Sequence, residues 1–163
     1  MREVKISWSE PIELFKPGTY NTDEKFIEHL RKVIATLESP LFDNPGMYMF
    51  LSGAVKPEEK LSVVIIEGTA DHTIREIITK KKGHVREFKC LYKNYKDENL
   101  YIKIGNIENA ELNEENIKSV VCSLIEYASP SCMEPCKNSS EKLIIENLGS
   151  FTPLKQVYGK EEE

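Results

Sequence analysis

The amino-acid sequence predicts an α+β fold in which a small, mainly antiparallel sheet is flanked by helices, with an N-terminal helical addition. Two short apolar runs, 46–51 and 61–66, are rich in aromatic or β-branched residues and bounded by Gly or Pro, which is typical of strands. Only the turn-like segment 54–60 separates them, so they must pair antiparallel, because a parallel crossover needs a dozen or more residues. Apolar residues at positions 26, 27, 30, 33, 34 and 37 then predict an amphipathic helix before the strands.

The length of 163 residues fits one domain, 1–163, large enough to bury roughly 70% of the surface that its unfolded chain would expose. Within this domain we expect three parts. Residues 1–43 form an N-terminal strand or loop and the amphipathic helix, 44–154 form the core, and 155–163 form an acidic tail.

Charge and hydropathy restrict the partners and the compartment. A net charge of −5 means that any nucleic-acid binding must rely on a local basic patch. The sequence shows neither a hydrophobic signal region at its start nor an apolar run near the length of a membrane span. We therefore expect a cytoplasmic location and no membrane partner, and in that compartment the four cysteines are expected to be thiols rather than disulfides.

The ends of the predicted helices carry capping signals. Asn21, with Glu24 three residues on as its capping-box partner, predicts the start of the first helix, and Ser39-Pro40 predicts its end. A second helix is predicted over 71–82, with Asp71 at the cap and a glycine beyond three lysines. A third is predicted from an Asn113 cap to about position 127.

Three further strands are predicted after the second helix. Alternation of apolar and polar residues indicates strands at 85–92 and 100–104, and the polar link between them predicts a hairpin. The last strand is predicted at 143–146.

A group of motifs in the core resembles the GIY-YIG endonuclease family. Gly46-Met47-Tyr48 is followed by an apolar strand ending in Ile66-Glu67-Gly68 and by a helix that carries Arg75. Leu124-Ile125 with Pro130 downstream, and Asn138 followed by the stretch 145–149, are also similar to pieces of the family's sequence. The resemblance implies that 44–154 has the family's fold, a small antiparallel sheet flanked by helices.

The resemblance also implies a chemistry, phosphodiester hydrolysis with one divalent metal ion. In the family a tyrosine helps to activate water, an arginine stabilises the transition state, and a helix glutamate holds the metal. Tyr48, Arg75 and Asn138 lie at or beside catalytic positions and are the vestigial catalytic candidates. Mg²⁺ is the expected cofactor only of an active nuclease.

Three departures from the family's pattern predict impaired catalysis. The second tyrosine position is Ile66, and the metal-binding glutamate position is Val121, so no metal site is predicted. The arginine position is Glu76, one residue beyond Arg75, and one residue is roughly 100° around a helix. An active nuclease would therefore need a rearranged site, rebuilt with residues such as Arg75 and Glu134.

Other side chains suggest contacts rather than catalysis. The basic cluster Lys80, Lys81, Lys82 and Arg86 is the candidate nucleic-acid-binding site, although cations at a helix end also have a structural role. Whether Cys132 and Cys136 bind a metal or form disulfides is left open by their spacing.

Three functions follow, in order of preference. The first is a catalytically impaired GIY-YIG nuclease-like domain that binds DNA or RNA weakly. The second is a protein-interaction or structural domain without nucleic acid. The third is an active metal-dependent DNA endonuclease with a rearranged site. The oligomeric state is left open.

Overall fold

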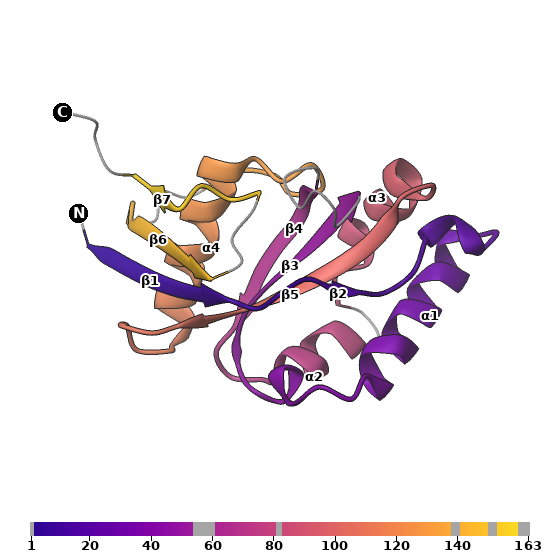
Figure 1. The fold of residues 1–163 in the computed structure, drawn as a ribbon, viewed down its shortest axis with the longest axis horizontal. Coiled ribbons are helices and arrows are strands. Elements are labelled where there is room, and N and C mark those ends of the chain that lie inside the picture. Colours follow the sequence, from indigo (N-terminus) through magenta and orange to yellow (C-terminus); the bar gives the residue numbers. More distant parts are fainter. Residues whose placement is uncertain (1, 54–60, 81–82, 138–140, 150–152, 160–163) are drawn as a thin grey trace.

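The computed structural model describes residues 2–53, 61–80, 83–137, 141–149 and 153–159. In these ranges the chain forms four α-helices and one seven-stranded sheet (Figure 1). The strands are β1 (Glu3–Trp8), β2 (Ile12–Glu13), β3 (Gly46–Gly53), β4 (Ser62–Thr69), β5 (Asn99–Ile107), β6 (Ile144–Gly149) and β7 (Val157–Tyr158). The helices are α1 (Asp23–Thr36), α2 (Ile74–Thr79), α3 (Val85–Tyr95) and α4 (Glu114–Ala128).

The sheet runs in the order β4-β3-β5-β1-β6-β7, and β2 pairs with β5. Its described strand pairs are antiparallel except β1–β6, so the predicted α+β class with a mainly antiparallel sheet is confirmed. The predicted pairing of 46–51 with 61–66 is also confirmed, because β3 and β4 are antiparallel neighbours in which Tyr48 faces Glu67 and Met49 faces Ile66. The start of the chain was expected as a strand or a loop; it forms the strand β1, which lies within the sheet between β5 and β6.

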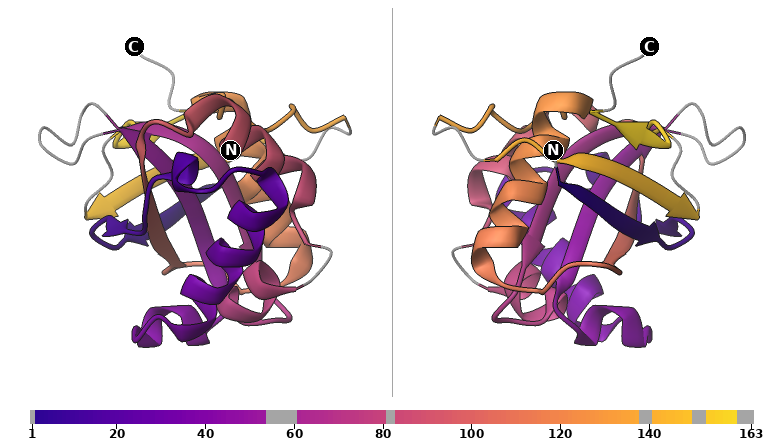
Figure 2. Two further views of the ribbon diagram at one scale, coloured as in Figure 1. Left: turned by 90° about the vertical axis from the view of Figure 1, so that its right-hand side faces the viewer. Right: turned by 90° about the vertical axis from the view of Figure 1, so that its left-hand side faces the viewer.

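The sheet carries a hydrophobic core on each face. Successive side chains of β3 alternate between the two faces, as the geometry of a strand requires. Met47, Met49 and Leu51 pack with α4, β1 and β6, whereas Tyr48 and Phe50 pack with α1, α2 and α3. The ribbon views accordingly show α4 beside β1, β6 and β7 at one end of the molecule and α1, α2 and α3 at the other (Figures 1 and 2).

The predicted helices exist, with shifted ends. α1 is capped by Thr22, whose hydroxyl accepts a hydrogen bond from the Lys25 amide, rather than by Asn21. α2 is shorter than 71–82, because Thr73 and Glu76 form a capping box that starts the helix at Ile74; residues 81–82 lie outside the described ranges. The predicted Asn113 cap of α4 is confirmed.

The prediction of a strand at 85–92 is wrong, because this segment belongs to α3. The apolar residues Val85, Phe88, Leu91 and Tyr95 recur every three or four positions, and Phe88 and Leu91 are buried. A window of eight residues fits both a helical and an alternating pattern, and the pattern becomes helical only when it is extended to position 95. The predicted hairpin is therefore absent, and β5 pairs with β3, β1 and β2 instead.

The prediction of free thiols is also wrong. Cys90 of α3 bonds to Cys132, and Cys122 of α4 bonds to Cys136, so no cysteine is free. Cys132 and Cys136 therefore belong to different disulfides and do not form a thiolate metal site together. The two bonds attach the segment after α4 to α3 and to α4 itself.

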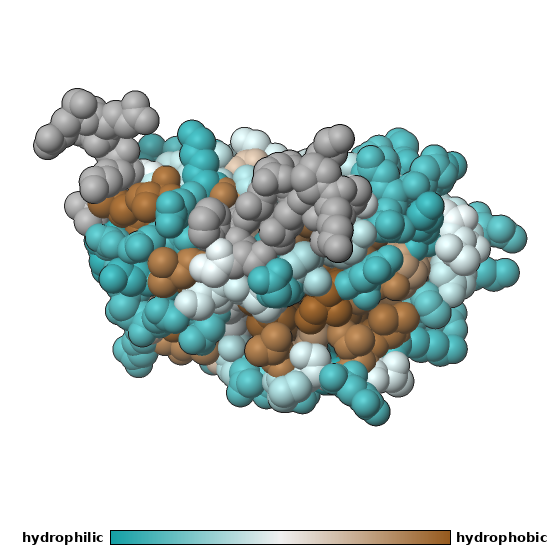
Figure 3. Space-filling model, viewed as in Figure 1, coloured by the Kyte–Doolittle hydropathy of each residue, from teal (hydrophilic) through white to brown (hydrophobic). Residues whose placement is uncertain are grey.

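The surface in the view of Figure 3 is mostly hydrophilic, with an apolar area near the middle of the molecule. The exposed large apolar side chains of the described residues are Leu41 in the turn Pro40–Asp43, Leu112 in the loop before α4 and Val157 on β7, which lie far apart in the sequence. Within the described ranges, no helix combines the length and apolar character needed to cross a membrane.

Candidate functional site

Tyr48 lies on β3, between β4 and β5, and its side chain is fully buried. Its hydroxyl lies 2.6 Å from Nε2 of His84. Burial raises the pKa of the phenol well above its usual value of 10, and the negative charges of Glu67 and Glu87 raise it further. Tyr48 is therefore a neutral hydrogen-bonding group near pH 7 rather than a phenolate.

Glu67 lies directly opposite Tyr48 in the β3–β4 register. Opposite residues of an antiparallel pair point to the same face, so the carboxylate and the phenol share one side of the sheet. Burial raises the pKa of Glu67 to about 7; repulsion by Glu87 adds to the shift, and a hydrogen bond from the Gly68 backbone opposes it. At neutral pH this carboxyl group is therefore close to half ionised.

His84 precedes α3 and adopts a left-handed backbone conformation, with φ of 58°. This conformation is uncommon for a residue other than glycine, so the structure around His84 must hold it in place. Burial lowers the pKa of the imidazole below its usual value; Glu87 opposes this shift and Arg31 adds to it. The imidazole is therefore neutral at pH 7 and able to act as an acceptor or a ligand.

Three of these side chains could hold a metal ion. One ligand atom from each of Glu67, His84 and Glu87 can be chosen so that all three lie within 4.8 Å of one another, and each residue is partly buried. Glu87 stands three residues after His84, about one turn along the chain. We call Tyr48, Glu67, His84 and Glu87 the tyrosine cluster.

Two cavities border the tyrosine cluster. One, of about 800 Å³, is lined by Glu67, Val121 and the carboxylate-bearing residues Glu114, Glu115 and Glu134, with Lys118 as the basic residue of its lining. The other, of about 450 Å³, is lined by Glu87, Glu134 and the Cys90–Cys132 disulfide. Negative charge thus predominates around the larger cavity, which favours cations over anions.

Arg75 lies away from the tyrosine cluster and has a structural role. Its guanidinium donates to the backbone carbonyls of Ile34, Leu37 and Ser39 at 2.5–3.1 Å and pairs with the Asp43 carboxylate at 2.8 Å. The Ile34 carbonyl lies in the last turn of α1, where a helix leaves carbonyl groups without partners, and the other two carbonyls lie beyond the end of the helix. The structure therefore does not bring Arg75 together with Tyr48.

The other positions discussed with the family pattern lie in different surroundings. Val121 lines the larger cavity, but an aliphatic side chain offers no ligand. Ile66 is fully buried in the core on the α4 face, opposite to the face that holds Tyr48. Asn138 lies outside the described ranges. Glu134, proposed for a rearranged site, lines both cavities and forms an ion pair with Arg86.

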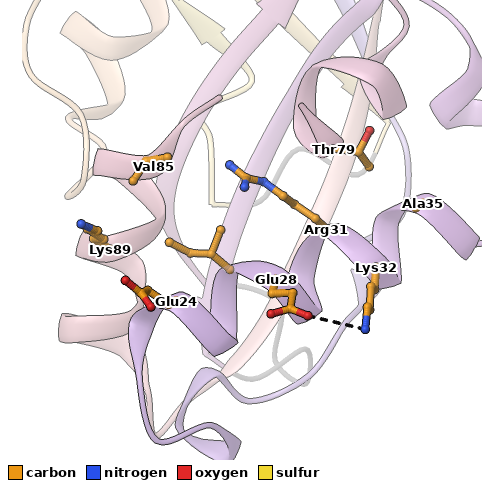
Figure 4. A pocket seen from close by; sticks show the side chains of 9 residues that line it. Glu24, Glu28, Arg31, Lys32, Ala35, Thr79, Val85 and Lys89 are labelled. Atoms are coloured by element: carbon orange, nitrogen blue, oxygen red, sulfur yellow. Dashed lines mark ion pairs between the residues drawn. The ribbon is translucent and has the colours of Figure 1, made fainter. Parts of the chain in front are cut away.

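A third cavity, of about 750 Å³, lies between α1 and α3 (Figure 4), whereas Arg86 of the predicted basic cluster lines the cavity of about 450 Å³. Arg31, Lys32 and Lys89 line the third cavity, and Lys80 follows its lining residue Thr79. Arg31 donates to the Gly83 carbonyl at 2.9 Å, while its buried Nε atom has no hydrogen-bond partner among the described residues. Lys81 and Lys82 lie outside the described ranges.

Sequence reasoning missed Glu67, His84 and Glu87. A signal for Glu67 exists, because it is a charged residue at the end of a strongly apolar strand. Glu87 gave no such signal, since it belongs to the segment 85–92 that was predicted as a strand, and His84 immediately precedes that segment. Comparisons of the chain with protein-family models, curated proteins and solved structures found no significant match.

Proposed function

We propose that the chain is a nuclease-like domain of the GIY-YIG type that binds nucleic acid and lacks the family's metal-dependent catalysis. The observation that carries this proposal is the position of Tyr48 on the middle strand of the antiparallel unit β4-β3-β5, with helices against both faces. This is the kind of fold that the motifs around Gly46 and Gly68 imply.

Loss of the family's catalysis is supported by three side chains. Val121 gives no carboxylate where the family has its metal ligand, and Ile66 gives no hydroxyl on the tyrosine face. Arg75 is occupied by backbone carbonyls and Asp43. A phosphodiester bound here would therefore meet neither the family's metal nor its arginine.

The surface between α1 and α3 is the proposed nucleic-acid contact. Lys80 and Lys89 are exposed there, and none of the ion pairs among the described residues includes either of them. Lys32 is also exposed but pairs with Glu28 at 3.6 Å (Figure 4). Arg86, in the first turn of α3, pairs with Glu134. Because two basic residues are free and two are partly neutralised, binding is expected to be weak and sensitive to salt.

Fluorescence anisotropy with labelled single- and double-stranded oligonucleotides tests the proposal. Binding should be measurable at about 20 mM salt and should weaken as salt rises, by roughly 0.9 in log–log slope for each duplex phosphate neutralised. The double variant Lys80→Glu, Lys89→Glu should lower affinity at least tenfold.

The double variant Lys5→Glu, Lys155→Glu is the matched control. Both lysines are exposed, and they lie on β1 and beside β7, at the other end of the molecule (Figure 1). Either variant changes the net charge from −5 to −9, since each substitution removes one positive charge and adds one negative charge. Equal effects of both variants, or no binding by the wild-type chain at low salt, would overturn the proposal. Either result would favour the hypothesis of a protein-interaction or structural domain without nucleic acid.

One observation favours a second candidate function, a metal-dependent nuclease with a rearranged site. Metal-capable side chains do lie beside Tyr48, but they are Glu67, His84 and Glu87 rather than Arg75 and Glu134. Metal-dependent DNA cleavage distinguishes this candidate from the first.

A further inference from the structure

We propose that Glu67, His84 and Glu87 form a binding site for one divalent first-row transition-metal ion, of the class of Zn²⁺, Co²⁺ or Mn²⁺. This site differs from the helix-glutamate position of the GIY-YIG pattern, which is Val121 here. The inference goes beyond nucleic-acid binding and does not rest on it.

The three ligands come from two elements that the fold holds together. Glu67 stands on β4, and His84 and Glu87 stand at the start of α3. Their ligand atoms lie within 4.8 Å of one another. Ligands about 2.1 Å from a tetrahedral ion are about 3.4 Å apart, so side-chain rotations that close gaps of up to about 1.4 Å complete the site.

The disulfide Cys90–Cys132 supports this arrangement from outside. It fixes α3, one turn after Glu87, to a segment whose amides at Ser131 and Cys132 donate to the carbonyls of Val63 and Val64 on β4. The helix and the strand are thus linked close to the ligands, so that a bound ion meets a partly preformed site.

Charge also favours a cation. Glu67 and Glu87 lie close enough for their negative charges to repel each other, and neither forms an ion pair with a lysine or arginine within the described ranges. A divalent ion between them removes this repulsion. The main opposing charge is that of Arg31, which acts on His84 from the α1 side.

The ligand types select the metal. An imidazole with two carboxylates suits zinc, cobalt, iron and manganese, whereas Mg²⁺ prefers oxygen ligands and keeps its water. Three protein ligands leave a coordination position open, as in catalytic rather than structural zinc sites. Glu67 lines the cavity of about 800 Å³ and Glu87 lines the cavity of about 450 Å³, so both carboxylate ligands border open space.

Tyr48 is the positioning residue of this site. Its hydroxyl lies 2.6 Å from Nε2 of His84. In the proposed site Nδ1 would hold the ion, and Nε2 would then carry the proton and donate it to the phenol oxygen. Histidine ligands are commonly oriented by an outer hydrogen bond of this kind, and its loss weakens metal binding.

Isothermal titration calorimetry of the chain with its disulfides intact tests the site with the metals alone and no nucleic acid. We expect one ion per chain, with affinity rising from Mg²⁺ through Mn²⁺ and Co²⁺ to Zn²⁺. Glu67→Gln, His84→Asn and Glu87→Gln should each weaken Zn²⁺ binding at least tenfold, and Tyr48→Phe should weaken it less. Asn tolerates the left-handed backbone at position 84, so this variant should fold.

His72→Asn is the matched control, because His72 and Glu76 form an exposed pair at 3.7 Å that could bind metal without any built site. This variant should leave Zn²⁺ affinity unchanged. The proposal is wrong if His72→Asn abolishes Zn²⁺ binding or if Glu67→Gln and Glu87→Gln leave Zn²⁺ binding intact. It is also wrong if the wild-type chain binds Mg²⁺ as tightly as Zn²⁺. Circular dichroism and the visible spectrum of the Co²⁺ form separate loss of the site from loss of the fold.

Discussion

The hydroxyl of Tyr48 lies 2.6 Å from Nε2 of His84, so strand β3 contacts the residue that precedes α3. The tyrosine is the residue that the sequence motif singles out, and the histidine is one that no motif indicates. Their contact explains how a neutral phenol and a neutral imidazole are accommodated beside two carboxylates, because each ring provides a hydrogen-bond partner for the other.

Replacing Tyr48 with phenylalanine should lower the free energy of unfolding by about 1 kcal/mol, because the partly buried His84 nitrogen loses its partner. The pKa of His84, measured by NMR, should also change. Tyr95→Phe removes an exposed hydroxyl that bonds to Ser131 and should cost less. Equal losses in the two variants would argue against a specific role for the Tyr48–His84 contact.

Ionisation of Glu67 should lower the free energy of unfolding as pH rises. The pKa of Glu67 is raised to about 7 in the folded chain, above its usual 4.5, so between these values the folded state binds more protons than the unfolded state. Glu67 therefore contributes fully to the free energy of unfolding below pH 4.5. This contribution, on the order of 3 kcal/mol, is lost as pH rises through 7.

Chemical denaturation of the wild-type chain and of Glu67→Gln, from pH 5 to pH 8.5, measures this contribution as a difference. The comparison is needed because the lowered pKa of His84 acts with the opposite sign below its usual value. The stability gap between glutamine and wild type should widen as pH rises. A gap that stays constant would show that Glu67 titrates normally.

Much of the fold could be predicted because local signals and tertiary contacts agree. The Asn113 cap, the apolar faces of α1 and α4 and the two Gly-bounded strands all identify elements that the structure contains. At 85–92 the alternating pattern of a short window competed with a longer helical period, and the helix was decided by burial of Phe88 and Leu91 against the sheet. The place of β1 between β5 and β6 depends on long-range pairing that no local pattern encodes.

The candidate site could be predicted only in part. Tyr48 was found because it belongs to a motif, while His84 and Glu87 reach it only when α3 is a helix. Arg75 lies near the family's arginine position in the sequence, but its guanidinium donates to carbonyl groups at and beyond the end of α1. Sequence spacing cannot show which carbonyl groups a guanidinium will meet.

Arg75→Ala should lower the free energy of unfolding by about 3 kcal/mol, because three carbonyls and Asp43 lose a charged donor. Arg75→Lys should recover little of this, since an ammonium group lacks the planar fork of donors. Arg86→Ala is the control: its exposed side chain pairs with Glu134 alone among the described ion pairs, so a change within about 0.5 kcal/mol is expected. Denaturant titration checks all three, and a mild effect of Arg75→Ala would contradict the structural role.

Removing the disulfides should destabilise the chain unequally. The Cys90–Cys132 bond closes the longer loop, with 42 residues of separation against 14 for Cys122–Cys136. Chain entropy then predicts losses of about 4 kcal/mol and about 3 kcal/mol for the respective double serine variants. Non-reducing mass spectrometry of the native chain should find both bonds, and thermal unfolding of the two variants ranks them. Free thiols in protein purified with an alkylating agent would contradict the pairing.

DNA cleavage with Mg²⁺ or Mn²⁺ should be undetectable with the wild-type chain. Hydrolysis needs an activated water and a cationic group at the phosphate as well as a metal ion. The Tyr48 phenol is held neutral by its raised pKa, Ile66 has no hydroxyl and Arg75 is occupied, so a metal at Glu67, His84 and Glu87 does not supply the missing groups.

Incubation with supercoiled plasmid and with single-stranded DNA, read as nicked, linear or shortened product, measures this directly. A chelator control separates metal-dependent cleavage from contamination, and the Glu67→Gln and Tyr48→Phe variants assign it. Metal-dependent cleavage that both variants abolish, and that His72→Asn leaves intact, would establish the rearranged nuclease in place of the impaired domain. Cleavage that persists in all three variants would indicate a copurified nuclease, because none of the residues beside Tyr48 would then take part.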